Sequence, residues 1–182
     1  MAQTSVMLNR PDPSEYAHYY HQYISRVPDG ALLDFLTRQL GDYRELFSGV
    51  SDTGAGQRPE PQKWSAKEVL GHVCDAERIM SYRALRFARG DSQELHGFEQ
   101  DDYVREANFN SRSLSALLTE FESVRKATIA LLGSLEPQAQ SRKGVANNNP
   151  VSVRALAYVI AGHAQHHLEG LRNRPKEYTT KA

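Results

Sequence analysis

Four stretches of the sequence repeat apolar residues every three or four positions, and breaks rich in glycine, proline or asparagine separate them. Such spacing gives a helix one apolar face, which must pack against a partner to leave water. The stretches cover residues 29–47, 65–90, 113–135 and 152–173. Since no alternating strand pattern competes with them, they predict an all-α fold, a four-helix bundle.

Polar residues mark where three of these helices should begin. Ser65 and Glu68 have the spacing of a capping box, in which each side chain bonds the other's backbone N–H. Ser152 can cap the last helix, and Asp29 is the predicted cap of the first. The second helix therefore has the strongest start signal in the chain.

The connections also constrain the topology. Residues 91–110 carry mixed charges and no sustained apolar period, and such a segment is long for a link between antiparallel neighbours. We expect it to cross the bundle, which leaves the second and third helices roughly parallel.

The runs 51–62 and 144–150 are predicted loops. The tyrosine-rich residues 15–27 form either a short helix or an extended arm. We expect one domain over 1–182, with an arm (1–28), a bundle (29–174) and a tail (175–182).

Composition excludes several classes of function. Lys plus Arg and Asp plus Glu both total 22, so the basic excess typical of nucleic-acid binding is missing. No window approaches the ~20 apolar residues of a membrane span, and the N-terminus has no signal-peptide core. A lone cysteine, Cys74, rules out an internal disulfide and suits a reducing cytosol. We therefore expect a cytoplasmic protein in which Cys74 is a small buried apolar residue.

Two histidines of the fourth helix carry the clearest chemical signal. His163 and His167 are four positions apart, so they share one helix face with Cβ atoms roughly 6 Å apart. The preceding turns of that face are apolar, which points the pair into the bundle. His166 lies about 100° away and is predicted at the rim or on the surface. The spacing also matches HExxH, but Ala164 replaces the glutamate, which argues against a zincin protease.

A third ligand is needed, and His72 is the best candidate because it lies on the inner face of the second helix. Three imidazoles from two helices would leave coordination positions for water or a substrate, as in catalytic zinc sites. Asp75, one turn away, is a candidate to orient a ligand, to bind the ion or to act as a base. No Glu-x-x-His motif occurs in the four predicted bundle helices, so a di-iron carboxylate site is not supported.

A structural interpretation competes with this one. Two histidines four positions apart also occur by chance, and an inward histidine can be a core residue that is hydrogen-bonded to its neighbours. The tyrosines between Tyr16 and Tyr23 are interpreted as packing residues, and so are His18, His21 and His96. The charged residues from Glu94 to Arg105 are interpreted mainly as a solvated loop. Its carboxylates at 99–102 could still offer a base, and the loop could lend Asp101, Asp102 or Tyr103 to a substrate.

The segments WSAKEVLGHVCDAERIMSYRALRFARGD, HGFEQDDYV and VIAGHAQHHLEGLRNR resemble the DinB superfamily, in particular its branch of DinB-like metal-dependent hydrolases. The resemblance extends over about 28–174. It implies a four-helix bundle with a long crossover and one divalent ion, zinc or nickel. The ligands would be one histidine of helix two and a His-x-x-x-His pair of helix four, which are His72, His163 and His167. It also implies a homodimer, and it implies no DNA-binding surface.

The resemblance leaves the reaction open. Some relatives resemble S-transferases that use a low-molecular-weight thiol such as bacillithiol or mycothiol; there, the bound thiol becomes a thiolate and attacks an electrophile. Others are called hydrolases, in which activated water attacks a carbonyl and a base is normally required. A third interpretation is a non-enzymatic module that the metal stabilises. Because the sequence offers no convincing base, we expect a metal-dependent enzyme with a small-molecule substrate and thiol chemistry ahead of hydrolysis.

Overall fold

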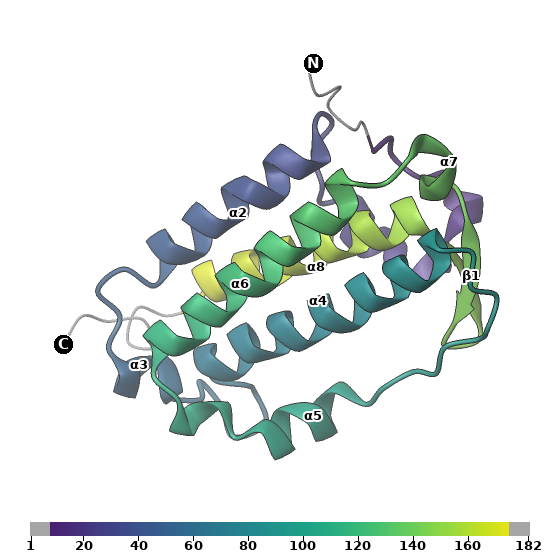
Figure 1. The fold of residues 1–182 in the computed structure, drawn as a ribbon. Coiled ribbons are helices and arrows are strands. Elements are labelled where there is room, and N and C mark those ends of the chain that lie inside the picture. Colours follow the sequence, from purple (N-terminus) through teal and green to yellow (C-terminus); the bar gives the residue numbers. More distant parts are fainter. Residues whose placement is uncertain (1–7, 175–182) are drawn as a thin grey trace.

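The computed structural model describes residues 8–174, so the predicted tail and the first seven residues of the predicted arm lie outside it. Its four long helices confirm the predicted all-α bundle (Figure 1). They are α2 (Leu32–Leu46), α4 (Ala66–Ala88), α6 (Leu114–Gly133) and α8 (Val153–Arg172). No helix in the described part of the chain is both long and apolar enough to span a bilayer.

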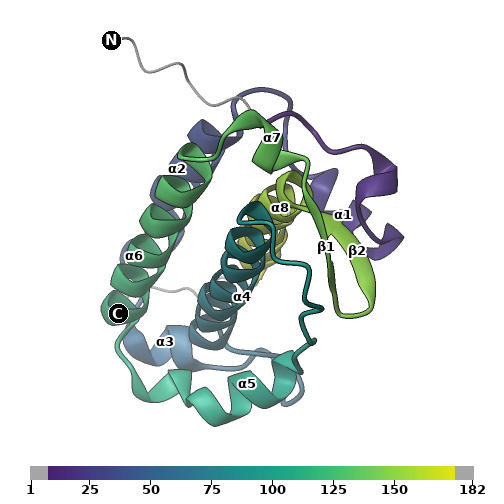
Figure 2. The same cartoon turned by 45° about the vertical axis from the view of Figure 1, so that its right-hand side comes forward.

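The helices are arranged as a four-membered ring with a crossover. Helix α4 packs against α6 and α8, and α2 packs against the same two helices. Helices α4 and α6 run in one direction and α2 and α8 in the other (Figures 1 and 2). The link from α4 to α6 therefore runs the length of the bundle, as predicted. It carries α5 (Gln100–Ala107) and the 3₁₀ turn η3 (Phe109–Ser111).

The helix starts follow the polar signals in two of three cases. Ser65 and Glu68 form the predicted capping box, and Ser152 accepts the backbone N–H of Ala155 at 3.0 Å. The predicted Asp29 cap is wrong. Helix α2 begins after Ala31 with no side-chain cap, and the Asp29 carboxylate instead pairs with Arg10 at 3.1 Å.

The sequence predicted a plain loop over 144–150, but in the structure this run is the centre of a β-hairpin. Strands β1 (Lys143–Ala146) and β2 (Asn149–Ser152) pair antiparallel, after the short helix α7 (Pro137–Gln140). Asn147 and Asn148 turn the chain with φ of 50° and 60°. Asparagine tolerates this left-handed conformation, which two-residue hairpin turns require. The predicted loop 51–62 likewise contains a short helix, α3 (Asp52–Gly56).

The hairpin holds the crossover in place. The Leu95 N–H donates to the Val145 carbonyl at 3.0 Å, and the Asn147 N–H donates to the Leu95 carbonyl at 2.9 Å. Through these two bonds Leu95 forms an isolated parallel β-bridge with Ala146 of β1. As a result, the residues that follow Leu95 are fixed beside α4.

The N-terminal arm folds into short helical turns against α8. These are η1 (Pro13–Glu15), η2 (His18–Tyr20) and α1 (His21–Ile24), and α1 packs on α8 (Figure 2). Gly162 allows this contact, because a Cβ atom there would lie 2.0 Å from the Tyr23 carbonyl oxygen. Ion pairs of Arg26 with Glu169 and of Arg154 with Glu15 also join the arm to α8.

A polar layer divides the core of the bundle. Buried apolar residues form two clusters, one toward the arm and hairpin and one toward α3. Between them lies Arg125, whose guanidinium pairs with Glu77 at 2.8 Å and donates to the Gln39 side-chain oxygen at 2.6 Å. Gln39 in turn donates to the Ala161 carbonyl at 2.9 Å. The layer therefore connects α2, α4, α6 and α8.

Candidate metal centre

The packing of α4 on α8 brings the three predicted ligands together. His72 Nε2 lies 3.0 Å from His163 Nε2, and His167 Nε2 lies 3.1 Å from the same atom. The three side chains each offer one nitrogen, and these atoms lie within 4.8 Å of one another. His72 comes from α4 and the other two come from successive turns of α8.

These distances fit a shared cation better than a hydrogen-bonded cluster. Zinc–nitrogen bonds of about 2.0–2.1 Å in a tetrahedron place neighbouring nitrogens roughly 3.3 Å apart. A ring nitrogen carries either one hydrogen or one in-plane lone pair, so it can form one well-aligned hydrogen bond. His163 Nε2 has two such neighbours. An ion between the rings would satisfy all three nitrogens at once, so the residues fit a divalent metal.

Burial keeps the three imidazoles in the neutral form that binds metal ions. It lowers the pKa of His72 to about 4 and that of His167 to about 3. The pKa of His163 falls well below its ordinary value, first through burial and then through the neighbouring histidines. Imidazolium cations are poorly solvated there, so lone pairs are available at neutral pH.

Hydrogen bonds from α2 position the histidine-bearing turns of α8. The Gln39 amide donates to the Ala161 carbonyl at 2.9 Å, and the Tyr43 hydroxyl donates to the Ala164 carbonyl at 2.8 Å. Both acceptors belong to turns adjoining His163. Just before α4, Trp64 places its ring 4.8 Å from that of His72, between centroids. The ligand turns are thus held from both sides.

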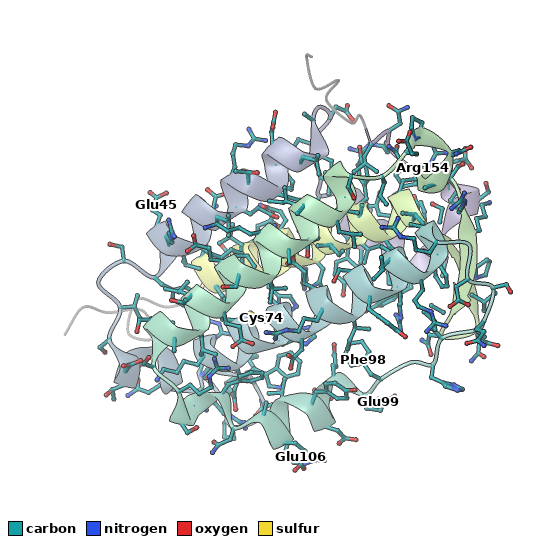
Figure 3. All side chains as sticks on the ribbon, viewed as in Figure 1. Glu45, Cys74, Phe98, Glu99, Glu106 and Arg154 are labelled. Carbon is teal, nitrogen blue, oxygen red and sulfur yellow. The ribbon has the colours of Figure 1, made fainter. Side chains whose placement is uncertain are left out.

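A pocket of about 260 Å³ opens beside His72 and His163. Helices α4 and α8 form its base, and three tyrosines of the arm form one wall. The crossover, with Phe98 and Glu99, and the hairpin turn complete it, and Phe98 lies on the side of the crossover that faces α4 (Figure 3). The arm tyrosines were predicted to pack. Tyr20 and Tyr23 do pack against the core, but with Tyr19 they also line this pocket.

The cluster is also accessible from the opposite side. His167 and His166 line a second hollow of about 540 Å³, together with Glu60 and Lys63. His166 is half-buried, and its ring contacts those of Tyr23 and His167. This agrees with its predicted place at the rim.

Comparisons with known proteins identify the fold family. The family model of the DinB superfamily matches residues 36–171. The chain belongs to the DinB superfamily. A solved structure similar to this DinB-superfamily chain is that of YfiT from Bacillus subtilis, described as a probable metal-dependent hydrolase with an unusual four-helix bundle topology. The two share 13% identity and a TM-score of 0.69 over 90% of each chain, a likeness of fold. A search of the curated proteins found no significant match.

The carboxylates of this DinB-superfamily site are mostly engaged elsewhere. Asp75 lies outside the histidine cluster and pairs with Arg78 at 3.3 Å, while burial raises the pKa of its carboxyl. Glu77 lines the pocket, but Arg125 holds both of its oxygens. Of the predicted 99–102 loop, residues 100–102 are instead the first turn of α5, and Glu99 just before it is the carboxylate that lines the pocket.

The remaining predicted side chains lie apart from the cluster. Cys74 is buried in the core and burial raises the pKa of its thiol, so it stays protonated. His18 and His21 stack on each other with ring centroids 6.2 Å apart. The side chains of residues 101–103 are exposed. His96 takes part through its backbone, since its carbonyl oxygen accepts a hydrogen bond from the Arg83 guanidinium at 2.7 Å.

Sequence reasoning missed two charged residues of the pocket, Glu77 and Arg83. A signal for Arg83 exists. His72, Ala76, Met80 and Arg83 are spaced by four, four and three positions, which places all of them on one face of α4. An arginine on the inner face of a helix is therefore visible in the sequence once His72 has set that face.

Proposed function

We propose that His72, His163 and His167 hold one divalent ion, zinc or nickel, and that the protein is a metal-dependent enzyme acting on a small molecule in the adjoining pocket. The observation that carries this proposal is the convergence of two imidazole nitrogens on His163 Nε2, at 3.0 and 3.1 Å. Because two of the three ligands also line the pocket, a molecule bound there would reach the centre directly.

When bound, a divalent ion at such a site supplies a Lewis acid that lowers the pKa of a thiol or of water. The chain's own residues set the rest of the chemistry. The apolar base and the tyrosine wall exclude water and orient the ligand. Arg125 holds both oxygens of Glu77, and Asp75 lies outside both the histidine cluster and the pocket lining, so neither is placed to take a proton from a ligand at the centre.

These constraints favour thiol S-transfer as the reaction. A low-molecular-weight thiol of the bacillithiol or mycothiol type can ionise beside a cation near neutral pH without a protein base. The thiolate sulfur would then attack an electrophile and displace its leaving group. Hydrolysis is the second candidate. It is supported by Glu99, which lines the same pocket, and by the description of YfiT as a probable metal-dependent hydrolase.

Metal analysis of the untagged protein tests the site. We expect about one equivalent of zinc or nickel in the wild type and most of it lost in His72→Ala, His163→Ala and His167→Ala. His166→Ala is the matched control: its ring adjoins the cluster but should leave the metal content unchanged. Circular dichroism should show the same helical content in all variants. Equal metal content in wild type and His163→Ala would contradict the ligand assignment.

The reaction is then tested with the metal-loaded protein. Aryl halide electrophiles are offered with low-molecular-weight thiols, and aryl esters and amides are offered without thiol. Thiol-dependent turnover that disappears in His163→Ala and persists in His166→Ala supports S-transfer. Thiol-independent ester or amide cleavage with the same variant pattern, reduced further in Glu99→Gln, would favour hydrolysis instead.

A further inference from the structure

A buried arginine lines the pocket beside the histidine cluster. Arg83 is 3% exposed, and with Arg125 it makes up the buried arginines of residues 8–174. The two differ in their partners. Arg125 is matched by the carboxylate of Glu77, whereas no carboxylate within the described range pairs with Arg83.

The polar contacts of Arg83 are with neutral groups. Its guanidinium donates to the His96 carbonyl at 2.7 Å and lies 3.7 Å from the Met80 sulfur. The Tyr20 hydroxyl also interacts with it. These contacts fix the orientation of the guanidinium but leave its positive charge without a counter-ion. A buried charge normally has a partner, because desolvation of an unpaired ion is costly.

We propose that Arg83 binds a carboxylate of the substrate, so that the substrates carry this group at one end and the reacting group at the other. The part of this proposal that concerns the reacting end rests on the proposed function. The part that concerns the carboxylate rests on Arg83 and the pocket alone. Guanidinium and carboxylate match in shape and can form two parallel hydrogen bonds.

The charge balance of the pocket favours a monoanion. Among its charged lining residues, Glu77 is neutralised by Arg125 and Glu99 is exposed to solvent, which leaves Arg83 as the single buried charge without a counter-ion. A phosphate dianion would add two negative charges opposite a single arginine. A carboxylate adds one, and Tyr20 can contribute a hydroxyl beside the same guanidinium.

The spacing along α4 sets the length of the ligand. His72 and Arg83 lie eleven positions apart, which is roughly 16 Å along a helix that rises 1.5 Å per residue. Arg83 leans back toward Met80, which shortens the span to roughly 12 Å. Between the two ends the base of the pocket is apolar, formed by Ala76, Met80 and Ile160 among others. The ligand is therefore an elongated molecule with an apolar middle.

Paired probes that differ only at the carboxylate test the proposal. The probes are 8-mercaptooctanoate and 8-mercaptooctanamide, and their dissociation constants are measured by calorimetry with the protein as purified. Charge-assisted hydrogen bonds give a preference of about tenfold or more for the acid over the amide in the wild type. Equal affinities for the two probes would overturn the proposal, whatever the metal content.

Variants of Arg83 on α4 and of Arg89, the residue that follows α4, locate the preference. Arg83→Gln should reduce the acid-to-amide ratio to about one, chiefly by weakening the binding of the acid. Arg83→Lys keeps the charge and should retain part of the ratio, so a failure of the Gln variant to fold leaves the proposal testable. Arg89→Gln removes an exposed charge outside this pocket and is the matched control. A ratio that survives in Arg83→Gln would overturn the proposal.

The same samples separate this proposal from the proposed function. Metal content reports on the histidine cluster, and the acid-to-amide ratio reports on Arg83. A wild type that binds no metal but prefers the acid through Arg83 would contradict the metal centre and support the carboxylate anchor. A wild type with one equivalent of metal and equal affinity for the acid and the amide would support the metal centre and contradict the binding of a carboxylate by Arg83.

Discussion

At the scale of single residues, His163 determines what the site can hold. Its Nε2 atom has two imidazole neighbours, at 3.0 and 3.1 Å, and can form a well-aligned hydrogen bond with only one of them. The contact with the other nitrogen is therefore unfavourable in the folded protein when no cation is bound. Burial also keeps the neighbouring rings neutral, so their lone pairs are available, and both effects favour metal binding at neutral pH.

The lowered pKa values predict how the metal-free protein responds to acid. The pKa values of His72 and His167, about 4 and about 3, lie below the ~6.5 of an unfolded histidine. Above pH 6.5 both states are neutral. Below it the unfolded chain takes up protons that the folded chain refuses, so the free energy of unfolding falls from about pH 6.5 to about pH 4.

Urea unfolding of chelator-treated protein at a series of pH values measures this effect. Each buried histidine contributes up to about 1.4 kcal/mol per pH unit within the window. His72→Gln should flatten the curve by the share of one histidine. A wild-type curve that is level between pH 6.5 and pH 4 would contradict the prediction.

At the scale of secondary-structure elements, Gly162 determines where the arm can lie. It precedes His163 on α8, and a Cβ atom at this position would meet the backbone of Tyr23. Backbone atoms cannot move aside as a flexible side chain can. The close contact in turn places the Tyr23 ring 5.3 Å from the His163 ring, between centroids. One glycine thus brings the tyrosine wall up to the metal centre.

Gly162→Ala should therefore displace α1 and destabilise the protein by about 1–3 kcal/mol, as overpacking does. Gly170→Ala is the matched control, because it lies on the same helix with nothing within 4 Å of the added Cβ. It should be neutral or stabilising by up to about 1 kcal/mol. Urea unfolding and trypsin cleavage after Arg26 measure the two effects. Equal stability and equal cleavage in both variants would show that α1 does not depend on Gly162.

The elements also show what the sequence can predict. Helices α4 and α8 begin where Ser65 and Ser152 indicate, because caps act within a single turn. The same local spacing placed His72, His163 and His167 on inward faces. The hairpin was missed because its asparagine turn has the composition of a loop. Its pairing with Leu95, about fifty positions earlier in the chain, is not visible in the local sequence. The pocket depends on such long-range pairings, which no local pattern contains.

At the scale of the whole molecule, the Arg125 layer joins two apolar cores. Arg125 is fully buried, and its partners Glu77 and Gln39 belong to different helices. Removing one partner of a buried ion pair is more costly than removing a surface pair, since the remaining charge has no solvent to stabilise it. The register of the four helices therefore depends on this layer as well as on apolar packing.

Glu77→Gln should lower the free energy of unfolding by about 3 kcal/mol or more, because Arg125 is left buried without a counter-ion. Glu122→Gln is the matched control. Glu122 pairs with Arg44 and Lys126 at the surface, where such pairs contribute little. Urea unfolding of the two variants provides the comparison. A loss of similar size in both would mean that the layer is not a stabilising unit.

The crossover between the parallel helices α4 and α6 has a consequence for how this protein can diversify. The three histidines belong to α4 and α8, whereas much of the pocket wall comes from the arm, the crossover and the hairpin turn. Connections tolerate substitution, insertion and deletion far better than helix interiors do. The lining of the pocket can therefore change through the connecting segments while the histidine cluster is kept, and an engineer could exchange residues 97–100 without altering any of the three histidines.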